Sequence, residues 1–350
     1  MERVKIGLIG LGFMGTTHFG IYKNCPGAQV VAIADVDERK RTGDISAVSG
    51  NIGDGEGSTM DMTGITAYAD GMKMIAESDA DVIDICVPTP FHADYVLAAL
   101  KAGKHVFCEK PLCRNKEQMK AIRAALDEHP GQFFNVGMCV RAWPEYAHTK
   151  QLLDSGALGA VKIAHFRRLS PTVAGHAWND WYAKEAMSGG AALDLHIHDT
   201  DIVCHYFGRP ASVMSVGLRG GMSDTGIDHI ITRYQFNDGR LVTAEGGWCA
   251  ARNVPFEMSY RIICEKATVD MGPAGYKIYW NDGRIETPEV DNKTLPTGWH
   301  KELTYWIDCI KNGIKPDKYQ NPQSVCDSFA VAMAEAESVD TGKEVEVSYV

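Results

Sequence analysis

The sequence lacks the features that mark several classes of protein. It has no apolar run near the roughly 18–20 residues that a membrane span needs, and it begins in a strand-like segment, so we expect no secretory leader. None of its ten cysteines forms a C-x-x-C pair, which argues against a zinc site or a disulfide framework. We therefore expect a cytoplasmic protein with reduced thiols and no membrane partner.

Basic residues are also in the minority. The chain has 35 Lys and Arg against 45 Asp and Glu, a net charge of −10. Its one basic cluster, Arg39–Arg41, is three residues long and resembles a solvated helix face. A nucleic acid partner is therefore not expected, because binding a phosphate backbone needs a larger basic surface.

What is present indicates an α/β protein of two domains, as expected for 350 residues. Short Val- and Ile-rich runs alternate with helical patterns over the first hundred residues, which predicts a doubly wound parallel sheet. Later runs alternate apolar and polar residues around two Asn-Asp-Gly turns, which predicts a mostly antiparallel sheet. We predict a Rossmann dinucleotide-binding domain at 1–125 and an α/β substrate domain at 138–350, with the final helix and strand as candidates to pack back near the first domain.

The segment 49–64 interrupts the first domain. It contains five glycines and almost no large apolar residue, so we predict a loop. Two interpretations stay open, because long loops serve as lids or interface elements but also arise as tolerated surface insertions.

A dinucleotide-binding fingerprint follows the first predicted strand. Gly10, Gly12 and Gly15 form G-x-G-x-x-G with Phe13 and Met14 between them, and Asp35 ends the second strand twenty residues later. The glycines allow a tight turn, close approach of the pyrophosphate and close helix packing. Asp35 should accept hydrogen bonds from the adenosine ribose and repel a 2′-phosphate, which favours NAD over NADP. The alternative is that the Arg39–Arg41 cluster bends back to hold that phosphate.

Three further segments indicate a more specific family than dinucleotide-binding proteins in general. They are Pro88–His92, Glu109–Pro111 and Gly189–Asp199. With the fingerprint, they make the whole chain resemble the Gfo/Idh/MocA oxidoreductases, the family of glucose–fructose oxidoreductase and inositol dehydrogenase. The resemblance implies a C-terminal domain with a large open sheet that forms a homodimer or homotetramer. It also implies an active site in the cleft between the domains.

The resemblance also implies roles for individual residues. The catalytic residues are Lys110, Asp194 and His198. The nicotinamide side of the cofactor is lined by Pro88, Thr89, Pro90 and His92, and Glu109 and Lys110 are further cofactor contacts. The chemistry agrees, since an imidazole suits the acceptor of a hydroxyl proton and an ammonium stabilises a developing alkoxide. Asp194 and His198 are four residues apart, so one helix would present both on the same face.

This chain departs from the family pattern at His196, which creates an H-x-H-D sequence with His198 and Asp199. Residues two apart on a helix point about 200° away from each other, so we expect no metal there. His196 would instead reach the substrate pocket or pack at a subunit interface. The candidate substrate contacts are Lys110, Arg141, Arg168, Trp178, Trp181, Asp194 and His198. The aromatic pair suits a sugar ring, but a hydrophobic plug would have the same composition.

The function we predict is NAD-dependent oxidation or reduction of a secondary ring hydroxyl of a sugar, a glycoside (C3 being a specific case) or a cyclic polyol. Two alternatives stay open. One is an NAD-dependent glycosidase that oxidises its substrate transiently before elimination. The other is a non-catalytic dinucleotide sensor, which should have lost the lysine or the histidine that this chain retains.

Overall fold

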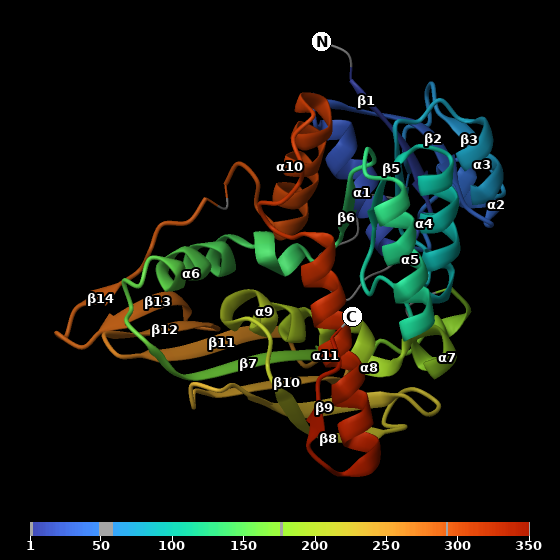
Figure 1. Ribbon diagram of the computed structural model, residues 1–350. Coiled ribbons are helices and arrows are strands. Elements are labelled where there is room, and N and C mark those ends of the chain that lie inside the picture. The colour runs from blue at the N-terminus through green and yellow to red at the C-terminus, as the bar shows by residue number, and fades with distance from the viewer. Residues whose placement is uncertain (1–2, 49–58, 176–177, 292, 350) are drawn as a thin grey trace. The chain divides into compact units, whose positions relative to one another are not determined.

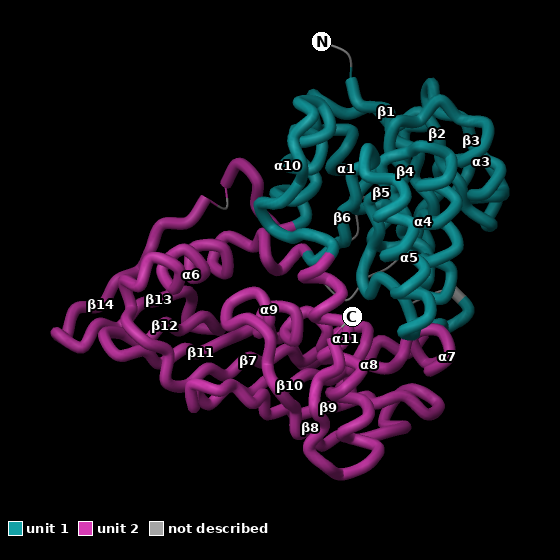
Figure 2. Tube along the Cα trace, in the orientation of Figure 1, with its two compact units in different colours: residues 1–138, 176–181, 299–322 teal, residues 139–175, 182–298, 323–350 magenta. Residues whose placement is uncertain are grey.

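The computed structural model describes residues 3–48, 59–175, 178–291 and 293–349. The chain forms two compact units, each built from several segments (Figure 2). Unit 1 comprises residues 1–138, 176–181 and 299–322, and unit 2 comprises 139–175, 182–298 and 323–350. The described helices include none that is long and apolar enough to cross a membrane.

Unit 1 contains a six-stranded, wholly parallel sheet with the order β3-β2-β1-β4-β5-β6. The strands are β1 (Val4–Ile9), β2 (Ala28–Ala34), β3 (Thr66–Tyr68), β4 (Val82–Ile85), β5 (His105–Cys108) and β6 (Phe134–Val136). The central strands are buried along nearly their whole length, which explains why their sequences are almost continuously apolar. This strand order is that of a doubly wound dinucleotide-binding fold, and its ligands bind at the carboxyl ends of the strands.

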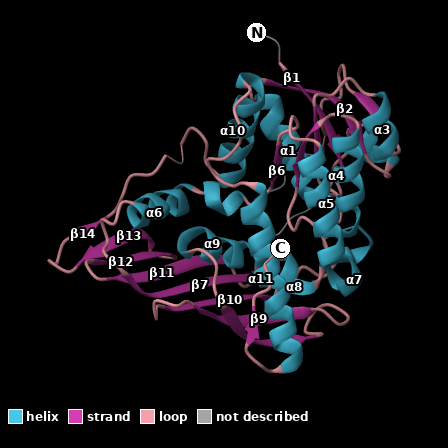
Figure 3. Ribbon diagram, in the orientation of Figure 1, coloured by secondary structure: helices cyan, strands magenta, loops and turns pink. Residues whose placement is uncertain are grey.

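Helices cover both faces of this sheet (Figures 1 and 3). They are α1 (Phe13–Asn24), α2 (Glu38–Arg41), α3 (Gly71–Glu77), η1 (Thr89–Phe91), α4 (His92–Lys101), α5 (Lys116–Glu128) and α10 (Gly298–Asn312). The last of these arrives from far along the sequence. Its Leu303, Trp306 and Ile307 are buried in the same apolar cluster as Tyr22 and Phe107. Unit 1 is therefore completed by residues near the end of the chain.

Unit 2 is built on a nine-stranded sheet with the order β14-β13-β12-β11-β7-β10-β9-β8-β15. Only the β7–β10 pair is parallel among the described pairs, so the sheet is mostly antiparallel, as predicted. Its strands are β7 (Val161–Pro171), β8 (Ser212–Arg219), β9 (Ile227–Gln235), β10 (Leu241–Ala250), β11 (Glu257–Cys264), β12 (Ala267–Gly272), β13 (Gly275–Trp280), β14 (Ile285–Glu286) and β15 (Val345–Glu346).

One face of the nine-stranded sheet is covered by helices (Figure 1). The helices outside unit 1 are η2 (Cys139–Ala142), α6 (Pro144–Asp154), α7 (Glu185–Ser188), α8 (Gly190–Asp194), α9 (Ile197–Phe207) and α11 (Pro322–Thr341), while η3 (Trp178–Ala183) belongs partly to each unit. Phe166, Ala244 and Ile262 point to the covered face and are fully buried. Alternate residues such as Ile163 and Leu241, which pair across β7 and β10, are exposed on the other face.

The structure corrects the predicted elements in two places. Asp194 and His198 do not lie on one continuous helix, because α8 ends at Asp194 and α9 begins at Ile197. The predicted final strand is limited to the two residues of β15, which pairs with β8 at the sheet edge. Most of the glycine-rich segment, residues 49–58, lies outside the described residues, while Asp44 and Thr59 form a bridge beside it.

Candidate active site

The glycine fingerprint forms the turn between β1 and α1. Gly10 has φ of +90°, and a Cβ there would lie 2.5 Å from the carbonyl oxygen of Cys86. A Cβ on Gly15 would lie 1.8 Å from the carbonyl oxygen of Gly10, so neither position accommodates a side chain. A Cβ on Gly12 would meet nothing within 4 Å, and no side chain caps the N-terminus of α1. The turn thus leaves open backbone at the positive end of a twelve-residue helix, which fits a pyrophosphate.

Asp35 follows β2 beside this turn. Its carboxylate accepts hydrogen bonds from the main-chain N–H of Leu11 (2.7 Å) and of Asp37 (2.8 Å). These contacts fix the carboxylate beside the glycine turn. Two residues of the nearby basic cluster differ in their contacts. Arg41 donates to the main-chain carbonyl oxygens of Asp35 and Val36, whereas the Lys40 ammonium lies 3.9 Å from the Asp35 carboxylate.

The segment after β4 carries the second group of predicted cofactor contacts. Pro88 precedes η1, in which Thr89 is buried and Pro90 takes a position of the first turn. His92 begins α4, and both of its ring nitrogens lie against main-chain carbonyl oxygens, those of Pro111 (2.8 Å) and Val87 (2.7 Å). Burial lowers the pKa of His92, while the two carbonyl oxygens oppose that effect.

Lys110 follows β5, at the same edge of the sheet. Its main-chain N–H donates to the carboxylate of Glu109 (3.0 Å), and a cis peptide bond joins it to Pro111. Glu109 is 5% exposed and lies against Gly137, where a Cβ would be 2.6 Å from its Oε1. Unit 1 therefore brings together the glycine turn, Asp35, the Pro88–His92 segment and Lys110 at the carboxyl ends of β1, β2, β4 and β5.

Asp194 and His198 flank the break between α8 and α9 in unit 2. The N–H of His196 donates to the carbonyl oxygen of Ala191 (2.8 Å), five residues back, and the regular helical pattern resumes only from Thr200. Asp194 is buried and His198 is half-buried. His198 is the most exposed residue of the run 196–201, whose other members are all buried.

The buried neighbours of His198 tie α9 to the rest of unit 2. Asp199 forms an ion pair with Arg168 of β7 (2.8 Å), and Asp201 forms one with Arg141 of η2 (2.6 Å). Each pair carries two hydrogen bonds, and all four side chains are at most 3% exposed. The guanidinium groups of Arg141 and Arg168 thus already have acidic partners within the protein. Their predicted contact with substrate stays a prediction.

His196 is fully buried within unit 2. Its Nε2 lies 3.3 Å from Glu335 of α11 and 3.3 Å from the hydroxyl of Tyr234, which itself donates to Glu335 (2.6 Å). Burial by itself lowers the pKa of His196, but Glu335 and Asp199 together raise it and the net pKa is raised. In the single chain this side chain is therefore part of a core network that links the start of α9 to α11.

The aromatic segment ahead of α8 is only partly described. Its residues Asn179 and Asp180 have φ of +54° and +47°, a left-handed conformation that is uncommon outside glycine. The side chain of Trp178 lies outside the described residues, and Trp181 is half-buried. The Tyr182 ring packs edge-on to Trp248 at 5.9 Å. Stacking of Trp178 or Trp181 on a substrate stays a prediction.

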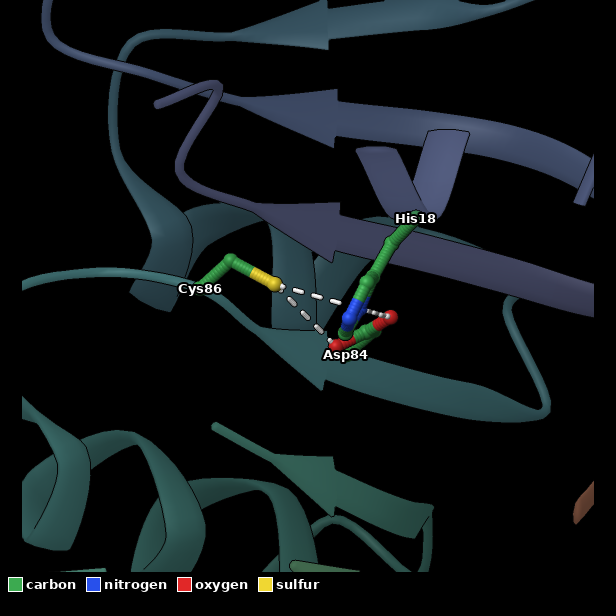
Figure 4. A group of neighbouring side chains, drawn as sticks. All are labelled: His18, Asp84 and Cys86. Carbon is green, nitrogen blue, oxygen red and sulfur yellow. Dashed lines mark hydrogen bonds and ion pairs between the residues drawn. The ribbon is translucent and has the colours of Figure 1, made fainter. Parts of the chain in front are cut away.

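Sequence reasoning missed a polar group inside unit 1. His18 of α1, Asp84 of β4 and Cys86 lie together, with both His18 and Asp84 fully buried (Figure 4). Nδ1 of His18 lies 2.9 Å from Asp84, and the Cys86 sulfur lies 3.4 Å from each of them. The one available signal was a carboxylate inside the otherwise apolar run Val82–Ile85, since a buried charge requires a partner.

Comparison with known protein families matches both parts of the chain. Residues 4–137 match the model described as "Oxidoreductase family, NAD-binding Rossmann fold", and residues 146–270 match that of the "GFO/IDH/MocA C-terminal domain". The chain belongs to the Gfo/Idh/MocA family. This member is an NAD-dependent oxidoreductase that acts on CH–OH groups, and its open Gly12 turn and Asp35 fit the cofactor.

Individual relatives extend over the full chain. Inositol 2-dehydrogenase 1 of Mycolicibacterium vanbaalenii is 25% identical over 358 residues, covering 100% of this chain and 98% of that protein. The scyllo-inositol dehydrogenase of Lactobacillus casei, solved with NAD(H) and scyllo-inositol, superposes with a TM-score of 0.77 at 22% identity, over 99% of each chain. A levoglucosan dehydrogenase solved with NADH and levoglucosan superposes with a TM-score of 0.80 at 21% identity, over 99% of this chain and 100% of that one. These structures share the fold of this Gfo/Idh/MocA oxidoreductase.

Proposed function

We propose that this enzyme oxidises a secondary ring hydroxyl of a neutral cyclic polyol or sugar to a ketone, with NAD as the hydride acceptor. The observation that carries the proposal is the pairing of Arg141 and Arg168 with buried aspartates. A substrate with a carboxylate or phosphate is commonly held by a guanidinium clamp, and these two side chains are already engaged. Full-length similarity to inositol 2-dehydrogenases supports a cyclic polyol as the first candidate.

The cofactor site is proposed at the strand ends of unit 1. Main-chain amides at Gly12, Phe13 and Met14 hold the pyrophosphate, and Asp35 accepts hydrogen bonds from the adenosine ribose. Pro88, Thr89, Pro90, His92 and Glu109 form or support the surface on the nicotinamide side. When bound, NAD supplies the acceptor for the hydride that leaves the substrate carbon.

The protein's own groups handle the proton and the charge. We assign the hydroxyl proton to His198, which is half-buried while every other residue of the run 196–201 is buried. Lys110 stabilises the alkoxide that develops as this proton leaves, because an ammonium interacts more strongly with an alkoxide than with a neutral hydroxyl. Asp194 orients the substrate or the lysine. The described cysteines form no disulfide and most of them are buried, which fits a cytoplasmic enzyme.

A substrate panel tests this proposal. The purified protein is expected to reduce NAD in the presence of inositols, neutral pyranoses or glycosides, which is measured by the absorbance of NADH.

Trp181→Ala should raise KM about tenfold, because it removes a stacked aromatic face worth about 1–2 kcal/mol. The same variant should weaken NAD binding less than it raises KM.

Other outcomes of the panel would contradict the proposal. Activity confined to open-chain hydroxy acids or to phosphorylated sugars would exclude a neutral ring as substrate. Glycoside cleavage without accumulation of NADH would favour the glycosidase. Mass spectrometry of the ketone product would identify the oxidised position, including C3 of a pyranoside.

We also propose that the uncovered face of the nine-stranded sheet forms a homodimer or homotetramer. Val216, Leu218 and Ile231 are exposed on neighbouring strands, with Val216 directly opposite Ile231. Exposed apolar side chains gathered on one face are typical of protein interfaces. Light scattering should give the mass of two or four chains, and Val216→Lys with Ile231→Lys should lower it, whereas a monomer at micromolar concentration would contradict the assembly.

A further inference from the structure

Lys110 stands between two residues that each lie against a buried histidine. On its N-terminal side, Oε1 of Glu109 lies 3.2 Å from Nε2 of His18. On its C-terminal side, the carbonyl oxygen of Pro111 lies 2.8 Å from Nδ1 of His92. The two histidines reach this turn from different helices, His18 from α1 and His92 from α4. One imidazole therefore contacts the side chain of the residue before Lys110, and another contacts the main chain of the residue after it.

Each histidine also has a close contact at its second nitrogen. Nδ1 of His18 contacts Asp84 (2.9 Å), which also accepts a hydrogen bond from the Tyr22 hydroxyl (2.8 Å). Nε2 of His92 contacts the carbonyl oxygen of Val87 (2.7 Å), in the segment after β4. Both rings thus link the β4 segment to the turn after β5.

The charge of His18 is set by groups from every element around it. Asp84 and Cys86 face it from the β4 segment, Glu109 from the end of β5, and Tyr22 from its own helix. Burial by itself lowers the pKa of His18, but Cys86 and Asp84 raise it, and the net pKa lies well above 6.5. The ring lies between two acidic side chains, with Asp84 at Nδ1 and Glu109 at Nε2.

We propose that His18 and His92 are positioning residues that together brace the Glu109–Pro111 turn and so fix the ammonium of Lys110 for alkoxide stabilisation. His18 acts through Glu109, because Oε1 of that side chain lies within ion-pair distance of the ring while Oε2 accepts the N–H of Lys110. His92 acts through the carbonyl of Pro111. This inference rests on the proposed function in one respect: it takes Lys110 as the residue whose ammonium stabilises the alkoxide.

A metal ion is the competing explanation for the group in Figure 4. The contacts favour hydrogen bonding, since Oδ2 of Asp84 accepts from both His18 and Tyr22. A metal at Nδ1 of His18 would require that nitrogen to be deprotonated. The brace depends on Nε2 of His18, whereas a metal site depends on Nδ1. Substitutions that replace one nitrogen but not the other therefore distinguish the two explanations.

Asparagine and glutamine variants separate the two nitrogens, because the Asn amide occupies the place of Nδ1 and the Gln amide that of Nε2. His18→Gln keeps the contact to Glu109, whereas His18→Asn keeps only the contact to Asp84. At the second position the order reverses, because His92→Asn keeps the contact to Pro111 and His92→Gln keeps only that to Val87. The brace therefore predicts that Gln is the better replacement at 18 and Asn at 92.

The size of the effect follows from the cost of misplacing a catalytic group. His18→Asn and His92→Gln are each expected to lower kcat about 10- to 10²-fold relative to the other variant at the same position. Affinity for NAD should differ by less than about threefold between the two His18 variants, since the glycine turn is unaltered. Tyr22→Phe is the matched control: it removes a buried hydrogen bond to Asp84 without touching the turn, so its kcat should stay within about threefold of the unaltered enzyme.

A second readout does not need the substrate. Reductive methylation followed by peptide mass spectrometry measures how fast the Lys110 amine reacts. This rate should change severalfold in His18→Asn and His92→Gln, but much less in His18→Gln and His92→Asn. If no polyol or sugar is oxidised, the proposed function fails while this rate still tests the brace. Equal rates within each pair, or a loss of kcat in Tyr22→Phe as large as that in His18→Asn, would overturn the brace. So would a stoichiometric metal ion in the purified protein that His18→Gln loses.

Discussion

Replacing Lys110 by alanine is expected to lower kcat by at least about 10²-fold, because the developing alkoxide loses its only assigned cationic partner. His198→Ala should cause a loss of similar size by removing the proton acceptor. Steady-state rates on the best substrate of the panel provide the measurement. Turnover within about threefold of the unaltered enzyme for either variant would show that its assigned role is wrong.

The controls for this prediction use cofactor binding. Lys110→Ala should leave the affinity for NAD nearly intact, since the pyrophosphate and ribose contacts lie at the glycine turn and Asp35. Asp35→Ser should give the opposite pattern, with weaker NAD binding and a narrower gap between NAD and NADP. Titration calorimetry with each cofactor separates the two patterns, and a weak NAD complex in Lys110→Ala would mean that the lysine serves binding rather than catalysis.

Replacing Arg168 by methionine is expected to destabilise the protein by about 3–5 kcal/mol, because it leaves the Asp199 carboxylate buried without its partner. The carboxylate is fully buried, with the Arg168 guanidinium 2.8 Å away. Denaturant titration measures the loss. The double variant Arg168→Met with Asp199→Leu should recover most of it, since an apolar pair of similar volume avoids the uncompensated charge.

The same double variant distinguishes anchoring from substrate binding. If Arg168 acts by anchoring α9, restored stability should return kcat to within about tenfold of the unaltered enzyme, because His198 keeps its place. If Arg168 contacts substrate, KM should stay high even in the stable double variant. A double variant as unstable as Arg168→Met would contradict the ion-pair explanation itself.

The fold of both units could be predicted because its signals are local. The glycine fingerprint, Asp35 at the end of β2 and short apolar strands each follow from neighbouring residues. The mostly antiparallel sheet followed from alternation and from the Asn-Asp-Gly turns, the second of which joins β13 to β14. Local rules suffice where a segment's own pattern determines its structure.

The parts that could not be predicted depend on distant partners. No glycine or proline marks the break at Leu195 and His196, and His196 is instead held by Glu335, from far along the chain. Arg168 reads equally well as a cleft residue or as half of an ion pair, because its partner Asp199 lies in another element. The same holds for His18 and Asp84. The sequence shows a polar residue within an apolar run, but it does not show which residue forms its hydrogen bond.

The late return of α10 to unit 1 has a consequence for how the protein is made. Tyr22, Phe107 and their neighbours pack against Trp306 and Leu303, so a nascent chain of 138 residues has every strand of the parallel sheet but lacks part of its cover. Each large apolar side chain left exposed forgoes about 1.5–3 kcal/mol of burial. Cotranslational folding of the cofactor-binding unit therefore reaches completion only after the ribosome has also synthesised most of unit 2. Any transplant of this unit into another enzyme must include residues 299–322.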